Sequence, residues 1–221
     1  MDTYAVVICD IIKSRSLKRR AEAQDAIDLA LREINQRYRE FLAIPFQFTL
    51  GDEFQGVLRD HSKAPLIAAR FREEIAPLKI RVAIGIGAIT TALSDDIRKV
   101  DGPAFYAARD AMRDLLSTER DGLKQRRRLT ALRTEAGRDE VVDTVFTLYD
   151  TIISGRTEKQ WWVAKAYDQA GSVTRASEIF GTTVQNISKL ANAARLAETE
   201  SAERFLERYL SGEFRSMYSD K

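Results

Sequence analysis

The acidic residues that could hold a metal ion lie at two places in the first quarter of the chain. The stretch "TLGDEFQGVL" (residues 49–58) carries Asp52 and Glu53 at a Gly-Asp turn, and Asp10 directly follows the apolar run "YAVVIC". An acid after a buried strand lies where open sheets commonly bind ligands, and converging carboxylates repel unless a cation lies between them. The pattern therefore predicts a hard cation, Mg²⁺ or Mn²⁺, held by oxygen. The alternative is that Asp10 caps the next segment and Asp52 only serves the turn.

Composition narrows the class of protein. The 221 residues, 44% apolar and 31% charged, are typical of a globular chain with one large or two modest domains. A single cysteine, Cys9, excludes an internal disulfide framework and favours a reducing cytoplasm. No stretch approaches the ~18 apolar residues that cross a bilayer, and the chain begins on a strand instead of a signal peptide. We therefore expect a cytoplasmic protein with no membrane partner.

The elements that must position these acids alternate between strands and helices. Apolar patterns predict strands at 4–9, 46–50, 54–58 and 80–89, and helices at 18–42, 64–75 and from about 102. Pro45 is expected to close the first helix, and residues 126–133 to form an edge strand. The order β-α-β-β-α-β predicts an α+β, ferredoxin-like domain with helices on one face of its sheet. In that order the hairpin strands can lie beside the first strand, which would bring Asp52 close to Asp10.

Strand signals stop after residue 137, so we predict a domain at 1–136 and a helical domain at 137–221. Helical spacing marks residues 138–153, a helix from Thr157, a pair of short helices at about 174–196, and an amphipathic helix at 198–210.

The short pair fits a helix-turn-helix. In "ASEIFGTTVQNISKL" (residues 176–190), a turn at Gly181 separates two apolar sets that are expected to face inward, Ile179 with Phe180, and Val184, Ile187 and Leu190. The side chains left outward are of types that contact base edges and phosphates in double-stranded DNA: Thr183, Gln185, Asn186, Ser188 and Lys189. The alternative is a small helical bundle for dimerisation, which uses the same core geometry.

Four segments in this order, "CDIIKSR", "TLGDEFQG", "RVAIGIGAITT" and "DGPAFYAAR", resemble the SatD family of bacterial proteins. That family is similar to the palm-type nucleotidyl cyclases, especially the GGDEF diguanylate cyclases. The resemblance implies a palm domain that binds a nucleoside triphosphate with metal ions and works as a homodimer. Carried over by motif, the metal ligands are Asp10, Asp52 and the backbone of Ile11, and the catalytic set is Asp10, Asp52 and Glu53. The triphosphate would be held by the backbone of Ile12, Lys13 and Ser14 and by Arg109.

The sequence differs from the cyclase motifs at two positions that contact the nucleotide base. Leu50 replaces the first glycine of GGDEF, and Lys18 stands where the cyclases read guanine with an asparagine. The residues that bind metal and phosphate in the cyclases are therefore matched in this sequence, whereas those that recognise guanine are not. Diguanylate synthesis is not expected. We predict a regulator in which a nucleotide-binding palm domain is coupled to a DNA-binding helix-turn-helix. The alternatives are an active nucleotidyl cyclase or nucleotidyltransferase, and an inert interaction module.

Overall fold

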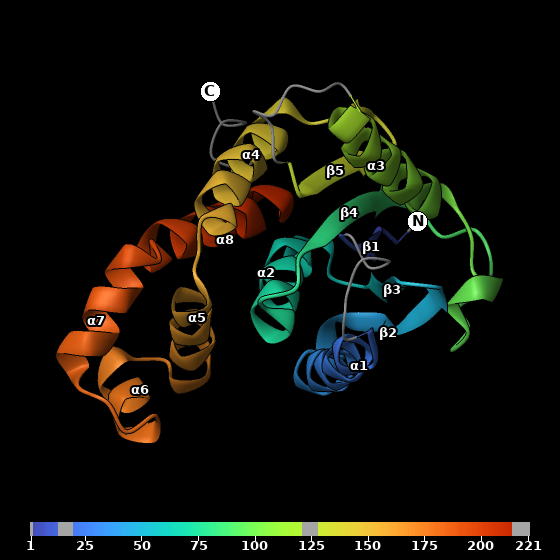
Figure 1. Ribbon diagram of the computed structural model, residues 1–221. Helices are drawn as coiled ribbons and strands as arrows, with labels where there is room; N and C mark the ends of the chain where they lie inside the picture. Colours follow the sequence, from blue (N-terminus) through green and yellow to red (C-terminus); the bar gives the residue numbers. More distant parts are fainter. Residues whose placement is uncertain (1, 13–19, 121–127, 214–221) are drawn as a thin grey trace.

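The computed structural model describes residues 2–12, 20–120 and 128–213, which form a six-stranded sheet and eight α-helices (Figure 1). The strands are β1 (Tyr4–Ile11), β2 (Leu42–Leu50), β3 (Glu53–Leu58), β4 (Ile80–Gly87), β5 (Thr130–Thr134) and β6 (Gly137–Arg138). The helices are α1 (Arg20–Arg37), α2 (Ala64–Ile75), α3 (Pro103–Arg120), α4 (Glu140–Ser154), α5 (Glu158–Ala170), α6 (Val173–Ile179), α7 (Val184–Ala193) and α8 (Leu196–Leu210). The protein is therefore of the mixed α+β class, as predicted.

The sheet order is β2-β3-β1-β4-β5-β6, and all neighbours are antiparallel except β4 and β5. Its first four strands, with α1 and α2, follow the predicted βαββαβ order, and the hairpin of β2 and β3 lies beside β1. Strand β1 is central and buried on both faces, which explains its continuous apolar run.

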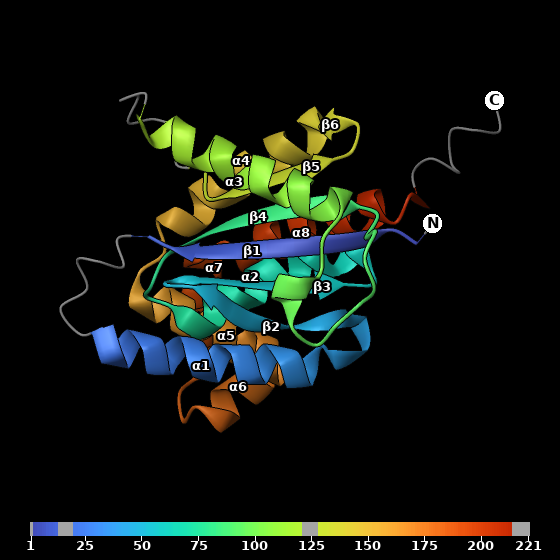
Figure 2. The same cartoon turned by 90° about the vertical axis from the view of Figure 1, so that its right-hand side faces the viewer.

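Helices cover both faces of the sheet, so the expectation that they would share one face is wrong (Figure 2). Helices α1 and α2 pack on the face that carries Val7 and Cys9, while α3 packs on the face that carries Val6 and Ile8. Gly85 permits the close approach of α3, because a Cβ at this position would overlap the backbone of Ala104 and Ala108.

Two element boundaries differ from the predictions. Helix α1 ends at Arg37 and Pro45 lies inside β2, where it is tolerated because β2 is an edge strand with an irregular register around Pro45. The Asn35 side chain holds this segment, since it accepts a hydrogen bond from Phe46 N (2.7 Å) and donates one to Phe46 O (2.8 Å). Strand β5 is not an edge strand, because it lies between β4 and β6.

The C-terminal helices divide between two hydrophobic cores. Helices α4 and α8 contribute Val142, Phe146 and Leu206 to the large core on the α1–α2 face of the sheet. Helices α5, α6 and α7 surround a smaller core that includes Val163 and Ile187, and they lie together to one side of the sheet (Figure 1). A domain boundary near residue 136 stays a prediction, and the packing assigns α4 and α8 to the same core as the sheet.

The two short helices form at the predicted place, with Gly181 in a left-handed conformation between them (φ +61°). Ile187 is buried as expected, whereas Ile179 (57% exposed) and Val184 (39% exposed) are not the inward-facing residues predicted. The small core consists mostly of alanines with Val163, Ile187 and Leu196. Outside it, the Trp162 and Phe180 rings meet edge-to-face at 5.0 Å.

Candidate functional site

Three charged residues from neighbouring strands form a row at one end of the sheet. In the strand register, Asp10 of β1 lies directly opposite Glu53 of β3 on one side and Arg81 of β4 on the other. Side chains alternate along a strand, so Asp10 follows Val6 and Ile8 on the face that α3 covers. The topology therefore brings Asp10 to the hairpin acids, as the βαββαβ order predicts, although its direct cross-strand neighbour is Glu53.

Arg81 pairs with Asp10 and was missed by the sequence reading. Its Nη1 donates to Asp10 Oδ2 at 2.5 Å, and the residue is only 7% exposed. The sequence did carry a signal for this pair, because Arg81 is the single charged residue in the otherwise apolar stretch 80–87. A buried arginine normally needs an anionic partner.

Glu53 is half-buried, and burial is the main cause that raises the pKa of its carboxyl group. The Thr49 hydroxyl opposes this shift by donating to Glu53 Oε1 at 3.1 Å, while the charges of Asp10 and Asp52 reinforce it. This mutual repulsion between carboxylates is what a bound cation would relieve.

Asp52 and Arg109 flank this row from the turn and from α3. Asp52 follows Gly51, whose φ of +63° makes the tight reversal between β2 and β3. The exposed Arg109 guanidinium lies 5.9 Å from the Phe105 ring centroid and 3.6 Å from Asp101, and its charge lowers the pKa of Glu53. Asp10, Asp52 and Arg109 thus all lie within electrostatic reach of Glu53.

Of the backbone part of the predicted site, the structure describes Ile11 and Ile12. Ile11 ends that strand, and its side chain is buried in the large core. The Ile12 N–H donates to Lys79 O at 2.8 Å, so this amide is already engaged. Lys13 and Ser14 fall outside the described residues.

The donor set fits a single Mg²⁺ or Mn²⁺ ion. Within the described ranges, no three Asp, Glu, His or Cys side chains converge as a metal site. Magnesium in nucleotide sites commonly takes only one or two protein carboxylates, and phosphate oxygens and water complete its shell. Asp10 and Glu53, side by side at the end of the sheet, fit that mode of binding.

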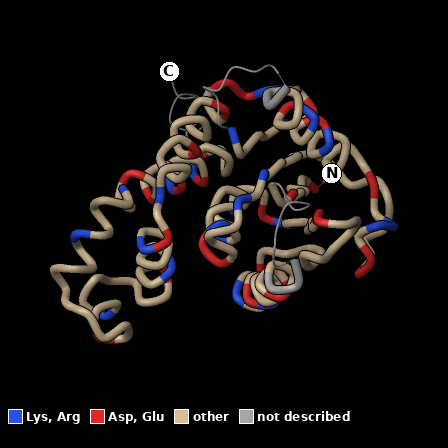
Figure 3. Tube along the Cα trace, viewed as in Figure 1, with Lys and Arg blue, Asp and Glu red and all other residues tan. Residues whose placement is uncertain are grey.

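The residues predicted to contact DNA lie on the outer side of α7. Thr183, whose hydroxyl accepts from Asn186 N and so caps the helix, is exposed, as are Gln185, Asn186 and Lys189; Ser188 is half-buried. Few basic residues lie on α6 and α7 (Figure 3), chiefly Arg175 and Lys189.

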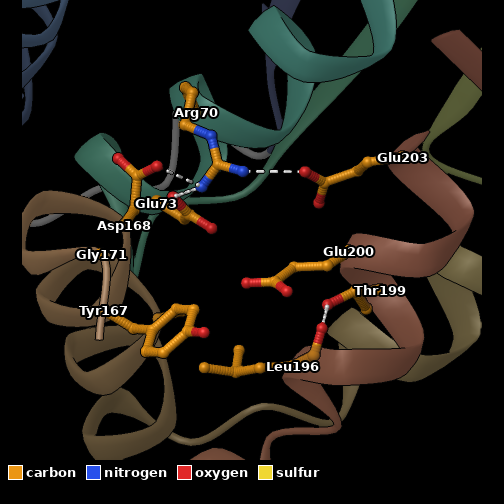
Figure 4. Close-up of a pocket in the computed structure, with 10 residues that line it drawn as sticks. Arg70, Glu73, Tyr167, Asp168, Gly171, Leu196, Thr199, Glu200 and Glu203 are labelled. Carbon is orange, nitrogen blue, oxygen red and sulfur yellow. Dashed lines mark hydrogen bonds and ion pairs between the residues drawn. The ribbon is translucent and has the colours of Figure 1, made fainter. Parts of the chain in front are cut away.

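A separate cavity of about 200 Å³ lies between α2, α5 and α8 (Figure 4). Its wall includes the buried Arg70 guanidinium, which pairs with Glu73, with Asp168 (3.2 Å) and with Glu203 (2.7 Å). Asp168 also pairs with Arg37 at the end of α1, so this ionic cluster joins four helices.

The six-stranded sheet, covered by helices on both faces and carrying Asp10, Glu53 and Arg81 in one row, places the protein in the mixed α+β class. Within that class, the chain belongs to the SatD family, whose model matches residues 4–190. No helix in the described part of the chain is long and apolar enough to cross a membrane.

Comparison with other proteins adds two solved structures. The catalytic core of a rhodopsin-guanylyl cyclase with converted specificity, crystallised with ATPαS, is 20% identical with a TM-score of 0.32, over 49% of this chain and 70% of that chain. A regulator of polyketide synthase expression from Bifidobacterium adolescentis is 11% identical with a TM-score of 0.31, over 98% of this chain and 82% of that chain. No curated protein matches the sequence.

Proposed function

We propose that this protein is a regulator that binds a nucleoside triphosphate together with Mg²⁺ or Mn²⁺ and contacts double-stranded DNA through a helix-turn-helix of α6 and α7. The observation that carries the nucleotide half is the direct cross-strand pairing of Asp10 with Glu53, with Asp52 adjacent in the turn. Three acids at one end of a sheet, one of them with its pKa raised by burial and by its neighbours, favour a cation-dependent ligand.

Each residue of the site has a distinct part in this proposal. Asp10 and Glu53 would hold the ion, Asp52 would add negative charge at the turn, and Arg109 would bind phosphate oxygens with its planar guanidinium. The ion neutralises phosphate charge when it is bound. The base is not assigned, because Leu50 and Lys18 replace the guanine-reading residues that the resemblance would supply.

Calorimetric titration tests the nucleotide half. We expect ATP, GTP, CTP or UTP to bind the wild-type chain in the presence of Mg²⁺ and to bind at least about tenfold more weakly in Asp10→Asn, which removes a proposed ion ligand, about 1.4 kcal/mol. Asp25→Asn removes one exposed carboxylate from α1 and serves as the matched control. Absence of binding by every triphosphate at millimolar concentration would contradict the proposal, and conversion of the nucleotide would favour an active cyclase or nucleotidyltransferase instead.

The DNA half rests on the outward, polar face of α7. Because basic side chains are few on this unit, a monomer would make few phosphate contacts and bind weakly. A homodimer, which would present two such helices to two half-sites, suits this surface better.

Salt-dependent DNA binding tests this half. Lys189→Ala is expected to weaken binding to all sequences and to lower the slope of log K against log salt by about 1. Lys99→Ala removes an exposed charge near the start of α3 and should leave the slope unchanged. Equal slopes for wild type and Lys189→Ala would remove this residue from the interface, and no binding at low salt would favour the dimerisation bundle.

A further inference from the structure

Arg81 gives the acidic site a fixed positive charge. Its strand, β4, pairs with β1 along eight residues and with β5 on the other side, so the backbone of Arg81 cannot move away from Asp10 without breaking the sheet. The side chain is 7% exposed and its Nη1 contacts Asp10 Oδ2 at 2.5 Å. The guanidinium is therefore a permanent neighbour of the acid on the central strand.

This contact bears on how many metal ions the site can hold. Nucleotidyl transfer by a two-metal site requires two ions about 3.5–4 Å apart, with a carboxylate placed between them. Asp10 is the acid in that position, because it lies between β3 and β4 while Glu53 and Asp52 are on the hairpin side. A second divalent ion on the β4 side of Asp10 would meet the Arg81 guanidinium, and like charges at such a distance repel.

We infer that Arg81 takes the position of one of two cations, so that the protein binds its nucleoside triphosphate with a single divalent ion. This inference rests on the proposed function and deepens it. With one ion between Asp10 and Glu53 and a guanidinium in place of the other, the site retains the triphosphate without the second metal that nucleotidyl transfer requires. Arginine suits the position because it is always charged and binds phosphate oxygens in a bidentate manner. The site is thus a receptor for a metal–nucleotide complex.

Counting bound ions tests the inference. Mn²⁺ is titrated into the protein with the triphosphate that binds best by calorimetry, and free Mn²⁺ is followed by electron paramagnetic resonance. We expect one Mn²⁺ per bound nucleotide in wild type and in Arg81→Lys, which keeps the charge, and two in Arg81→Met. Arg59→Met removes a charge at the opposite end of β3 and is expected to stay at one. If Arg81→Met loses its circular dichroism signal, Arg81→Gln replaces it in the titration.

The outcomes separate the inference from the function on which it rests. Two Mn²⁺ ions in wild type, or one ion in a folded Arg81→Met protein, would overturn the role of Arg81 and leave nucleotide binding intact. No nucleotide-dependent Mn²⁺ binding in any variant would overturn the proposed function, and the role of Arg81 with it. Release of pyrophosphate by the wild-type protein would also contradict a site limited to one ion.

Discussion

At the scale of single residues, the sequence predicts the acids of the site better than their partners. Strand order predicts that the hairpin lies beside Asp10, but the register, which makes Glu53 and not Asp52 its direct neighbour, could not be predicted. Arg81 could not be assigned, since its partner depends on the register between β1 and β4, which the sequence does not specify. The same holds for Arg70, whose three acidic partners come from α2, α5 and α8.

Gly85 shows how one missing side chain sets the distance between layers. A Cβ at this position would overlap Ala104 O and Ala108 N, which are backbone atoms and cannot rotate away. Gly85→Ala is therefore expected to lower the free energy of unfolding by roughly 1–3 kcal/mol, the cost of overpacking a core. Urea denaturation followed by circular dichroism measures the change.

Gly155→Ala is the matched control for this substitution. Gly155 ends α4 with a φ of −87°, and its added Cβ would come no closer than 3.7 Å to another atom, Ile152 O. We expect its unfolding free energy to stay within about 0.5 kcal/mol of wild type. Equal losses in the two variants would mean that helix α3 does not need Gly85 for its close approach.

At the scale of elements, helix α2 is joined to α5 and α8 by charge. Arg70 meets Glu73, Asp168 and Glu203, and Tyr149 of α4 donates to Glu203 Oε1 at 2.9 Å (Figure 4 shows the first four). A second pair, Lys165 with Glu74 at 2.7 Å, joins α5 to α2. Three acids thus share one buried guanidinium, and burial raises the pKa of Glu73 to about 8 despite the Arg70 charge.

This cluster makes stability depend on pH. Because the pKa of Glu73 is higher in the folded chain than its ordinary 4.5, the folded state binds the extra proton, and stability falls as pH rises from about 4.5 to about 8. Glu73→Gln mimics the protonated form, so we expect it to gain stability over wild type by on the order of 1 kcal/mol at pH 8 and by little at pH 5.

Urea unfolding at both pH values measures the difference, and Glu33→Gln, on the exposed side of α1, is the control. A Glu73→Gln protein with the same pH profile as wild type would show that Glu73 stays ionised beside Arg70.

The helices and strands themselves were mostly predictable from apolar periodicity, and the errors have physical causes. Helix α2 matches its predicted range of 64–75, and Pro65 lies in its first turn, where proline favours the start of a helix. The prediction that Pro45 closes α1 was wrong, because an edge strand tolerates proline as readily as a helix terminus does. The placement of α3 on the second face follows from the crossover between β4 and β5, whose parallel pairing the sequence did not reveal.

At the scale of the whole molecule, the chain leaves the large core after α4 and returns to it with α8. The two ends of this departing segment are held together by Arg156, just after α4. Its guanidinium donates to Ala194 O (2.9 Å), just before α8, and to Thr199 Oγ1 (2.8 Å) in α8. The segment 157–194 therefore leaves the large core and returns to it, and it packs mainly around a small core of its own. Ion pairs of Lys165 and Asp168 still join it to α2. Segments with adjacent ends are the ones that proteins accept as insertions. In evolutionary terms, residues 157–194 form a segment that a lineage could exchange for another while Phe146 and Leu206 stay packed in the large core.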